Sequence, residues 1–167
     1  DTVVPKIMRE VGVDMWVLVS SEYNEDPVVK TMLPATWASA RRTMVLIFFD
    51  RGPEKGVERL AVSRYPVGDI FPAAWDPEAQ PEQWGRVAQL IAERSPRRIA
   101  ININPTFALA NGLSAGEHRQ LLTALGPTAA KLESHERMAL GYLETRTPED
   151  MAVYQGIMRV AHSLIPE

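Results

Sequence analysis

Two almost unbroken apolar runs, Met15–Ser20 (MWVLVS) and Thr43–Phe49 (TMVLIFF), constrain the fold of this 167-residue chain more than any other feature. Both are short and rich in β-branched or aromatic residues, which is typical of strands. A strand with one buried face alternates apolar and polar residues, whereas these runs are apolar at nearly every position, which indicates burial on both faces of a sheet. Shorter runs at Leu60–Ser63 and Ile99–Ile103 predict two further strands.

The connections between these runs predict a mixed sheet. DRGPEKG, which follows Thr43–Phe49, is rich in turn-forming residues and predicts an antiparallel hairpin with Leu60–Ser63. Helical patterns separate or follow the strands: Thr2–Val11 ending at Gly12, Asp26–Leu33, Glu78–Arg94, a helix capped by Ser114 with Glu117, and His135–Glu144 capped by Ser134. This alternation predicts an α/β fold, a three-layer α/β/α sandwich with a mixed sheet.

The last segment predicts a well-specified helix with one apolar face. Thr147 is suited to cap it, and Pro148 occupies the first helical position, where its missing N–H costs nothing. The apolar face comprises Met151, Tyr154, Ile157, Met158, Ala161, Leu164 and Ile165. Because the chain is expected to be purely helical after its last strand, we place a domain boundary there, which gives an α/β domain at 1–133 and a helical segment at 134–167.

Composition argues against several classes of function. The net charge is −3, and basic residues are interleaved with acidic ones, so the basic stripe of a nucleic-acid-binding protein is missing. The chain has no cysteine, which removes disulfides, thiolate catalysis and cysteine-based zinc sites. No apolar run is long enough for a transmembrane helix, and we expect neither a nucleic-acid nor a membrane partner. The compartment stays open, since a cysteine-free chain fits both the cytoplasm and export, and the N-terminus reads as a trimmed helix without a visible signal peptide.

Familiar catalytic motifs are missing from the sequence. Each histidine lies in a predicted helix among charged neighbours, without an HExxH pairing: His118, His135 and His162. Three serines at strand ends are conceivable nucleophiles, but no GxSxG motif surrounds them: Ser20, Ser21 and Ser63. Phosphate-binding glycine loops are also missing. We therefore assign no catalytic residue and no metal ligand to this chain.

The stretch Tyr23–Arg42 (YNEDPVVKTMLPATWASARR) is the best candidate for binding. It follows the carboxyl end of the first strand, which is where α/β domains usually bind ligands. A tryptophan beside prolines is also an ordinary way to anchor a loop on a core, so structural packing remains the main alternative. The residues to examine for an interface or substrate-gating role are Tyr23, Trp37 and Arg41.

Taken together, the order of elements and the final helix resemble the N-terminal half of the creatinase/prolidase family, which includes aminopeptidase P and Xaa-Pro dipeptidases. In that family, a segment of the form Leu–x–x–x–Arg/Lys–Ser/Thr–Pro–Glu–Glu/Asp, followed by a helix with an Arg–x–Ala pattern, links two domains. Here this pattern is met by Leu143, Arg146, Thr147, Pro148, Glu149, Asp150, Arg159 and Ala161. The resemblance covers nearly the whole chain.

The resemblance implies a fold like the ribonuclease H motif and a chain that is not an enzyme by itself. The full-length parent would be a metal-dependent Xaa-Pro peptidase, a hydrolase whose two divalent ions, Mn or Zn, lie in a C-terminal pita-bread catalytic domain. The N-terminal domain would assemble a homodimer and gate the active site, where the parent binds its peptide substrate. The last helix would pack on that catalytic domain through Met151, Tyr154, Met158, Ala161 and Leu164.

One departure from the family pattern leaves the parent's reaction open. Many relatives carry a Tyr-Leu-Thr-Gly-like stretch after the first strand, whereas this chain has the longer Tyr23–Arg42 segment. The parent is therefore either a peptidase or a creatinase-like hydrolase. Two other functions remain: a stand-alone small-molecule binding module that uses Tyr23–Arg42, and a self-sufficient serine hydrolase. In either case, an unpartnered apolar face on the last helix is expected to dimerise or to stay mobile.

Overall fold

The computed structural model describes residues 2–165, which are built around one five-stranded mixed sheet with the order β3-β2-β1-β4-β5. Its strands are β1 (Met15–Ser20), β2 (Met44–Asp50), β3 (Val57–Ser63), β4 (Ile99–Ile101) and β5 (Leu132–Ser134). β1 is antiparallel to β2 and parallel to β4, β2 and β3 form the expected antiparallel hairpin, and β4 is parallel to β5. The predicted α/β class and mixed sheet are confirmed.

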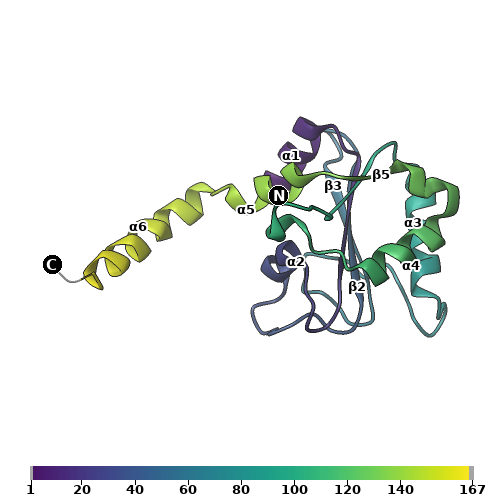
Figure 1. Cartoon of the computed structure of the whole chain (residues 1–167), viewed down its shortest axis with the longest axis horizontal. Helices are drawn as coiled ribbons and strands as arrows, with labels where there is room; N and C mark the ends of the chain where they lie inside the picture. Colours follow the sequence, from purple (N-terminus) through teal and green to yellow (C-terminus); the bar gives the residue numbers. More distant parts are fainter. Residues whose placement is uncertain (1, 166–167) are drawn as a thin grey trace.

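Helices cover both faces of the sheet, as Figure 1 shows. One face is covered by α1 (Val3–Val11), α2 (Pro27–Met32) and α5 (Glu136–Glu144), and the other by α3 (Gln83–Arg94) and α4 (Ala115–Leu125). The remaining elements are two short 3-10 helices, η1 (Ala108–Ala110) and η2 (Gly126–Lys131), and the last helix, α6 (Pro148–Ser163).

The two hydrophobic clusters explain why β1 is apolar at successive positions. Trp16 and Leu18 belong to the cluster under α1, α2 and α5, whereas Met15 and Val17 belong to the cluster under α3 and α4. All six residues of β1 are buried. Because successive side chains of a strand point to opposite faces, a central strand between two helical layers has no position where a polar side chain would meet water.

Local capping signals predicted the helix ends well. Gly12 terminates α1 with φ 71°, a left-handed conformation that glycine adopts without steric cost. Ser114 and Glu117 form the predicted capping box at the start of α4. Thr147 caps α6, accepting a hydrogen bond from the Asp150 N–H while the Asp150 carboxylate accepts one from the Thr147 N–H. Hydrogen bonding to its carboxylate from Thr147, chiefly from the backbone N–H, holds the pKa of Asp150 below its usual range.

Three details differ from the sequence-based expectations. The helix expected at Glu78–Arg94 begins only at Gln83, since Pro81 disfavours helical geometry in the residue before it. The chain also forms β5, which the sequence did not reveal because its three residues are at most half-buried. Ser134 was wrongly predicted to cap α5. It still belongs to β5, and its hydroxyl donates to the carbonyl of Ile103, so His135 takes the cap position instead.

The predicted boundary between residues 133 and 134 falls inside β5. Beyond it, α5 packs against α1 through Met138 and Ala139, which lie in the same buried cluster as Ile7 and Met8. Among residues 2–165, α5 is therefore the last element with residues in the core around the sheet. The division into two domains stays a prediction.

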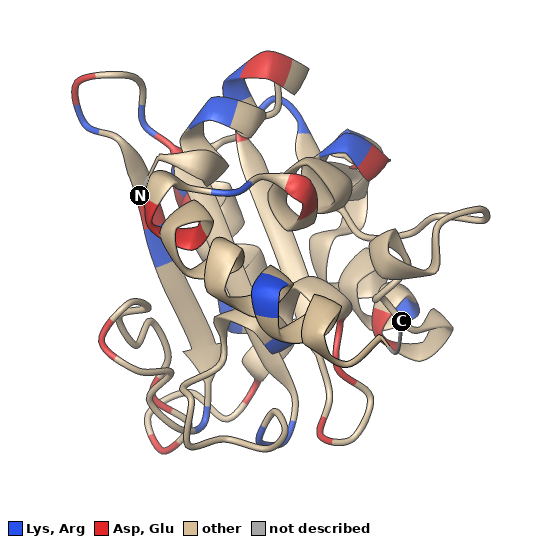
Figure 2. Cartoon of the chain, turned by 90° about the vertical axis from the view of Figure 1, so that its left-hand side faces the viewer, with Lys and Arg blue, Asp and Glu red and all other residues tan. Residues whose placement is uncertain are grey.

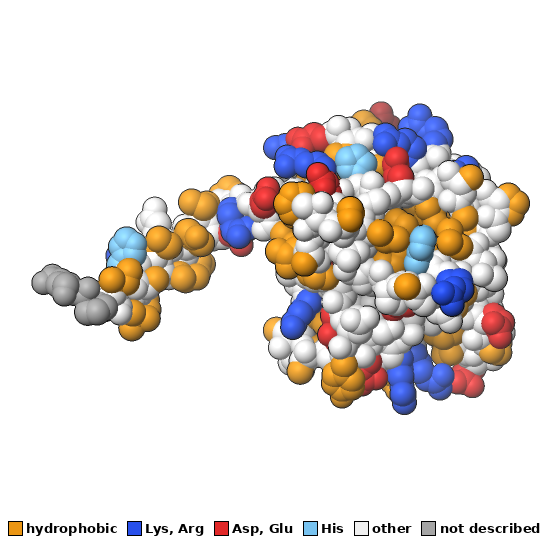
Figure 3. All heavy atoms as spheres, viewed as in Figure 1, with side chains coloured by type: hydrophobic (Ala, Val, Ile, Leu, Met, Phe, Trp, Pro, Cys, Tyr) orange, Lys and Arg blue, Asp and Glu red, His pale blue; other side chains and the backbone are white. Residues whose placement is uncertain are grey.

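Helix α6 extends away from this body (Figure 1), and none of its residues is buried. The five residues expected to pack on another domain are all exposed: Met151, Tyr154, Met158, Ala161 and Leu164. In Figure 3, hydrophobic side chains, drawn in orange, cover much of the visible surface of this projecting arm. Within residues 2–165, no helix is both long enough and apolar enough to cross a membrane.

Candidate functional site

The Tyr23–Arg42 segment lies at one edge of the sheet, where three strand ends meet. Ser20 at the end of β1 is opposite Met44 at the start of β2, and Met44 is opposite Ser63 at the end of β3. Residues that follow β1, precede β2 or follow β3 are therefore neighbours, although they come from separate parts of the sequence. This edge holds the candidate site.

A second possible site is filled by protein side chains. The chain leaves β1 toward α2 and leaves β4 toward α4, on opposite faces of the sheet, and such a divergence usually creates a ligand crevice. Here the Trp16 indole N–H donates to Asn102 Oδ1 at 2.9 Å, and Asn102 Nδ2 donates to Asp26 Oδ2 at 2.9 Å. All three side chains are buried. We call Trp16, Asn102 and Asp26 the buried polar triad.

Asp26 also fixes the start of α2. Its Oδ1 accepts hydrogen bonds from the N–H groups of Val28 and Val29 at 2.8 and 3.2 Å, and its own N–H donates to Ser20 Oγ at 2.9 Å. Burial raises the pKa of Asp26, and the nearby charge of Glu117 raises it further, against the lowering effect of the hydrogen bonds that the carboxylate accepts. The triad thus ties α2 to β1 and β4.

Glu117 makes a similar connection on the side of α4. One carboxylate oxygen accepts from Ser21 Oγ at 2.6 Å and the other from Ser114 Oγ at 2.6 Å. Ser20 and Ser21, two of the possible nucleophiles, are thus both engaged in bonds that join secondary-structure elements. Ser63 is buried, and its hydroxyl has no hydrogen-bond partner within the described part of the chain.

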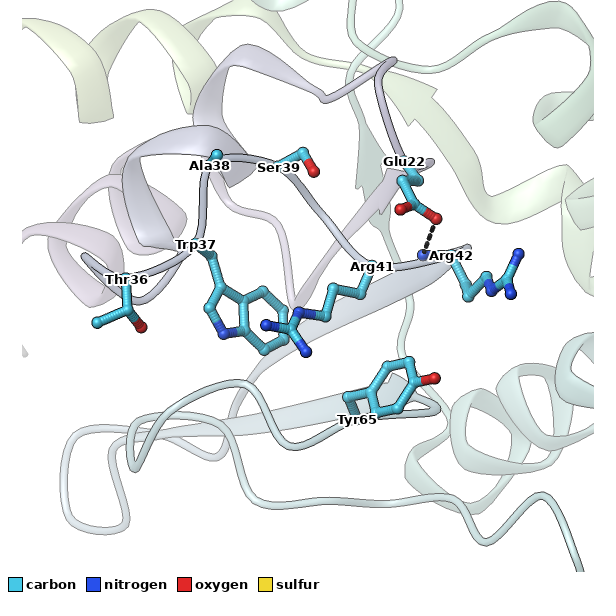
Figure 4. A pocket seen from close by; sticks show the side chains of 8 residues that line it. All are labelled: Glu22, Thr36, Trp37, Ala38, Ser39, Arg41, Arg42 and Tyr65. Atoms are coloured by element: carbon cyan, nitrogen blue, oxygen red, sulfur yellow. Dashed lines mark hydrogen bonds between the residues drawn. The ribbon is translucent and has the colours of Figure 1, made fainter.

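An open cavity of about 400 Å³ lies at the β1–β2–β3 edge, outside the filled crevice. Figure 4 shows its lining residues, which come from the Tyr23–Arg42 segment, from Glu22 just before it, and from Tyr65 just after β3. They are Glu22, Thr36, Trp37, Ala38, Ser39, Arg41, Arg42 and Tyr65. We call this cavity the edge pocket.

Arg41 lies at the centre of the edge pocket, between two aromatic rings (Figure 4). Its guanidinium carbon is 4.7 Å from the centroid of the Trp37 ring and 5.8 Å from that of Tyr65, both within the range of cation–π attraction. Trp37 is half-buried and packs against the hydrophobic core, so it also anchors the loop. The structural and the binding interpretations of Trp37 therefore apply together.

Two glutamates connect the beginning of the Tyr23–Arg42 loop to its end. Glu25 Oε1 accepts hydrogen bonds from the N–H groups of Tyr23 and Ala40 at 3.1 and 2.9 Å. Glu22 donates its N–H to the Arg42 carbonyl at 3.0 Å and accepts from the Arg42 N–H at 3.3 Å. These bonds hold Trp37 and Arg41 in place over the sheet edge.

The structure brings together two of the three residues singled out in this segment. Trp37 and Arg41 are in contact, whereas Tyr23 is 84 % exposed and is not among the lining residues. Tyr65 was missed, because it belongs to another segment. The predicted β2–β3 hairpin contained the necessary signal, since it places the residues after β3 beside those before β2.

No site for a metal ion is evident in residues 2–165, where no three His, Asp or Glu side chains are grouped closely enough to hold one. Basic and acidic residues are interspersed over the side of the chain that Figure 2 shows. No protein-family model, curated protein or solved structure matches this chain.

Proposed function

We propose that this chain is a non-catalytic N-terminal domain of a prolidase-like or Xaa-Pro aminopeptidase-like metallopeptidase, with a ribonuclease H-like arrangement of its mixed sheet. In this proposal the domain serves oligomer assembly and gates an active site carried by a C-terminal catalytic domain. That domain would bind two divalent ions, which activate water for hydrolysis. No residue of this chain is assigned to the metal ions.

The observation that carries the proposal is the exposed apolar face of α6, directly after the linker motif. Thr147, Pro148 and Asp150 of that motif start the helix, and the helix then presents its apolar side chains to solvent. In addition to the seven predicted residues, Val153 and Val160 are 63 % and 62 % exposed. At 100° per residue, the seven of these nine residues that lie within Pro148–Ser163 fall on one half of the helix, which fits packing against a further domain.

The gating role is supported by the position of the edge pocket. The pocket is open to solvent, with Tyr65 exposed and Trp37 half-buried in its lining. A neighbouring domain or subunit docked against this rim would have Arg41 and its two aromatic neighbours at the wall of its own cavity.

The coding sequence after the Glu167 codon tests the proposal directly. We expect two Asp, one His and two Glu in the arrangement of a dinuclear site, within a continuous reading frame. A stop codon close to Glu167 would contradict the proposal.

We also expect no Mn²⁺- or Zn²⁺-dependent cleavage of glycyl-proline by the purified 167-residue chain, because no metal-ligand group is assigned to it. A chromatographic assay for free proline checks this expectation. Cleavage that is abolished by a chelator would show that the chain is an enzyme in its own right.

Self-association of the chain provides a further prediction. We expect the 167-residue chain to dimerise reversibly through α6, since burying the apolar face removes it from water. Replacing Ile157 and Met158 by glutamate should make the chain monomeric and leave its fold intact, because both side chains are exposed and contribute nothing to the core. Analytical ultracentrifugation measures the effect, with Gln155→Glu on the polar face as the control. A wild-type chain that stays monomeric at every concentration would disprove this prediction.

A stand-alone small-molecule binding module is the second candidate function. It is favoured by one observation, the edge pocket with Arg41 between Trp37 and Tyr65. A thermal-shift screen with metabolites tests it, because a ligand that binds only the folded chain raises the melting temperature.

A further inference from the structure

We propose that Arg41, which lies near both Trp37 and Tyr65, is the binding site for the carboxylate group of a small ligand. The assignment goes further than a general gating role because it names the chemical group that is recognised. The further step, that Arg41 recognises the C-terminal carboxylate of a peptide substrate, rests on the proposed function. Binding of the carboxylate itself is a property of the described chain.

The first argument is the set of donors that Arg41 leaves unused. A guanidinium carries five N–H donors, all in its own plane. The Trp37 and Tyr65 ring centroids lie 4.7 and 5.8 Å from its central carbon, and cation–π attraction to them restrains the group without a conventional hydrogen-bond acceptor. Across residues 2–165, the Arg41 side chain makes no hydrogen bond or ion pair with a protein acceptor. A guanidinium with free N–H groups along one edge can donate two parallel hydrogen bonds to the two oxygens of a carboxylate.

The second argument is the local charge. The guanidinium of Arg42 has no recorded acceptor within the described range either, and Arg64, on the adjoining side of Tyr65, has only a loose exposed pair with Glu78 at 3.5 Å. Glu22 is the carboxylate in the lining, and it accepts a hydrogen bond from the Arg42 backbone. Within the lining itself, the two arginines Arg41 and Arg42 therefore outnumber the one glutamate, although the whole chain is acidic.

The third argument is the backbone at Arg42. Its φ is 58°, a left-handed conformation that is unfavourable for a non-glycine residue. Glycine would relieve this cost and keep both backbone hydrogen bonds to Glu22. Strained residues cluster where function requires a particular side chain. An arginine in this conformation at the rim of the pocket fits a role in attracting an anion.

An NMR titration at low salt tests the assignment, since salt screens exposed charges. The probes are glycyl-proline and glycyl-prolinamide, which differ in the carboxylate, and inorganic phosphate. We expect glycyl-proline to shift the signals of the Trp37 indole N–H and the Arg41 Nε–H, and glycyl-prolinamide to leave them unchanged. Equal shifts with both dipeptides, shifts with phosphate alone, or no shifts would overturn the proposal.

Variants separate binding from folding. Arg41→Gln should weaken glycyl-proline binding about tenfold or more, since it removes charge-assisted hydrogen bonds, and Arg41→Lys should restore only part of it. Arg119→Gln, an exposed arginine on α4, is the matched control and should bind like the wild type. Unchanged binding in Arg41→Gln would overturn the assignment.

Arg42→Gly gives the second line of evidence. We expect its melting temperature to equal or exceed that of the wild type, while its affinity for glycyl-proline falls several-fold. Unaltered affinity would remove Arg42 from the site. Because these measurements use only the 167-residue chain, they succeed or fail independently of the coding sequence after Glu167, which tests the proposed function.

Discussion

Replacing Gly112 by alanine should lower the free energy of unfolding by about 3 kcal/mol, the upper part of the range for overpacked sites. A Cβ atom at this position would overlap the carboxylate and the Cβ of Asp26. The carboxylate has little freedom to move, because it accepts hydrogen bonds from Asn102, Val28 and Val29. The backbone of residue 112 is restrained too, since the neighbouring Leu113 donates its N–H to the Asn102 carbonyl at 3.0 Å.

Urea denaturation of Gly112→Ala against the wild type measures this loss. Gly116→Ala in α4 is the matched control, since a Cβ there meets only the Ser114 hydroxyl at 4.0 Å. That control should gain up to about 1 kcal/mol, because alanine favours helix more than glycine does. A loss of less than about 1 kcal/mol in Gly112→Ala would show that α2 can shift away from residue 112 at little cost.

Asp26→Asn should lower the free energy of unfolding by about 2 kcal/mol near pH 4, although the two side chains have nearly the same shape. Asn102 Oδ1 accepts from Trp16, so its NH₂ group must face residue 26. Asparagine could still cap α2 with its oxygen, but its own NH₂ group would then point at the NH₂ of Asn102. Two donors would face each other in a buried site without an acceptor.

The cost of Asp26→Asn should shrink as the pH rises. The pKa of Asp26 is raised in the folded chain, so the folded state binds this proton more tightly than the unfolded state. The contribution of Asp26 to stability is therefore fully present below the unfolded pKa of about 3.9 and is lost as pH rises through the raised folded pKa. Asparagine does not titrate, so the variant has no such loss. The difference in free energy of unfolding between the wild type and the variant should therefore become smaller as the pH rises.

Urea denaturation of both proteins from pH 4 to pH 8 measures this difference. Other carboxylates act in the opposite direction, because Arg partners lower the pKa values of Asp14, Asp50 and Glu58. They are present in both proteins and cancel in the difference. A gap that is constant or widens with pH would contradict the raised pKa of Asp26.

The sequence predicted features that depend on neighbouring residues. The caps at Ser114 and Thr147, the left-handed end at Gly12 and the β2–β3 hairpin each rest on a few consecutive positions. Continuous apolar character correctly predicted that β1 is buried on both faces.

Features that need distant partners were not predictable in the same way. Asn102 is 86 residues from Trp16 and 76 from Asp26, and nothing in the local sequence of any of them indicates the other two. Tyr65 meets Arg41 only because the hairpin places it there. Tyr23 shared a segment with Trp37, but φ 65° and the bond from its N–H to Glu25 place it at an exposed turn, apart from the lining of the pocket.

Because the connection before α6 is short, small changes in its backbone angles move the far end of that helix by a large distance. Arg146 holds the end of α5 by donating to the Leu143 carbonyl at 2.6 Å, and the capping box at Thr147 starts α6 immediately afterwards. Bending between the two helices is therefore concentrated in the three connecting residues, 145–147. A 16-residue helix is about 24 Å long, so a rotation of about 10° at this joint moves its far end by about 4 Å. The backbone angles of residues 145–147 therefore set the orientation, relative to the sheet, of any domain or subunit that packs on the apolar face of α6.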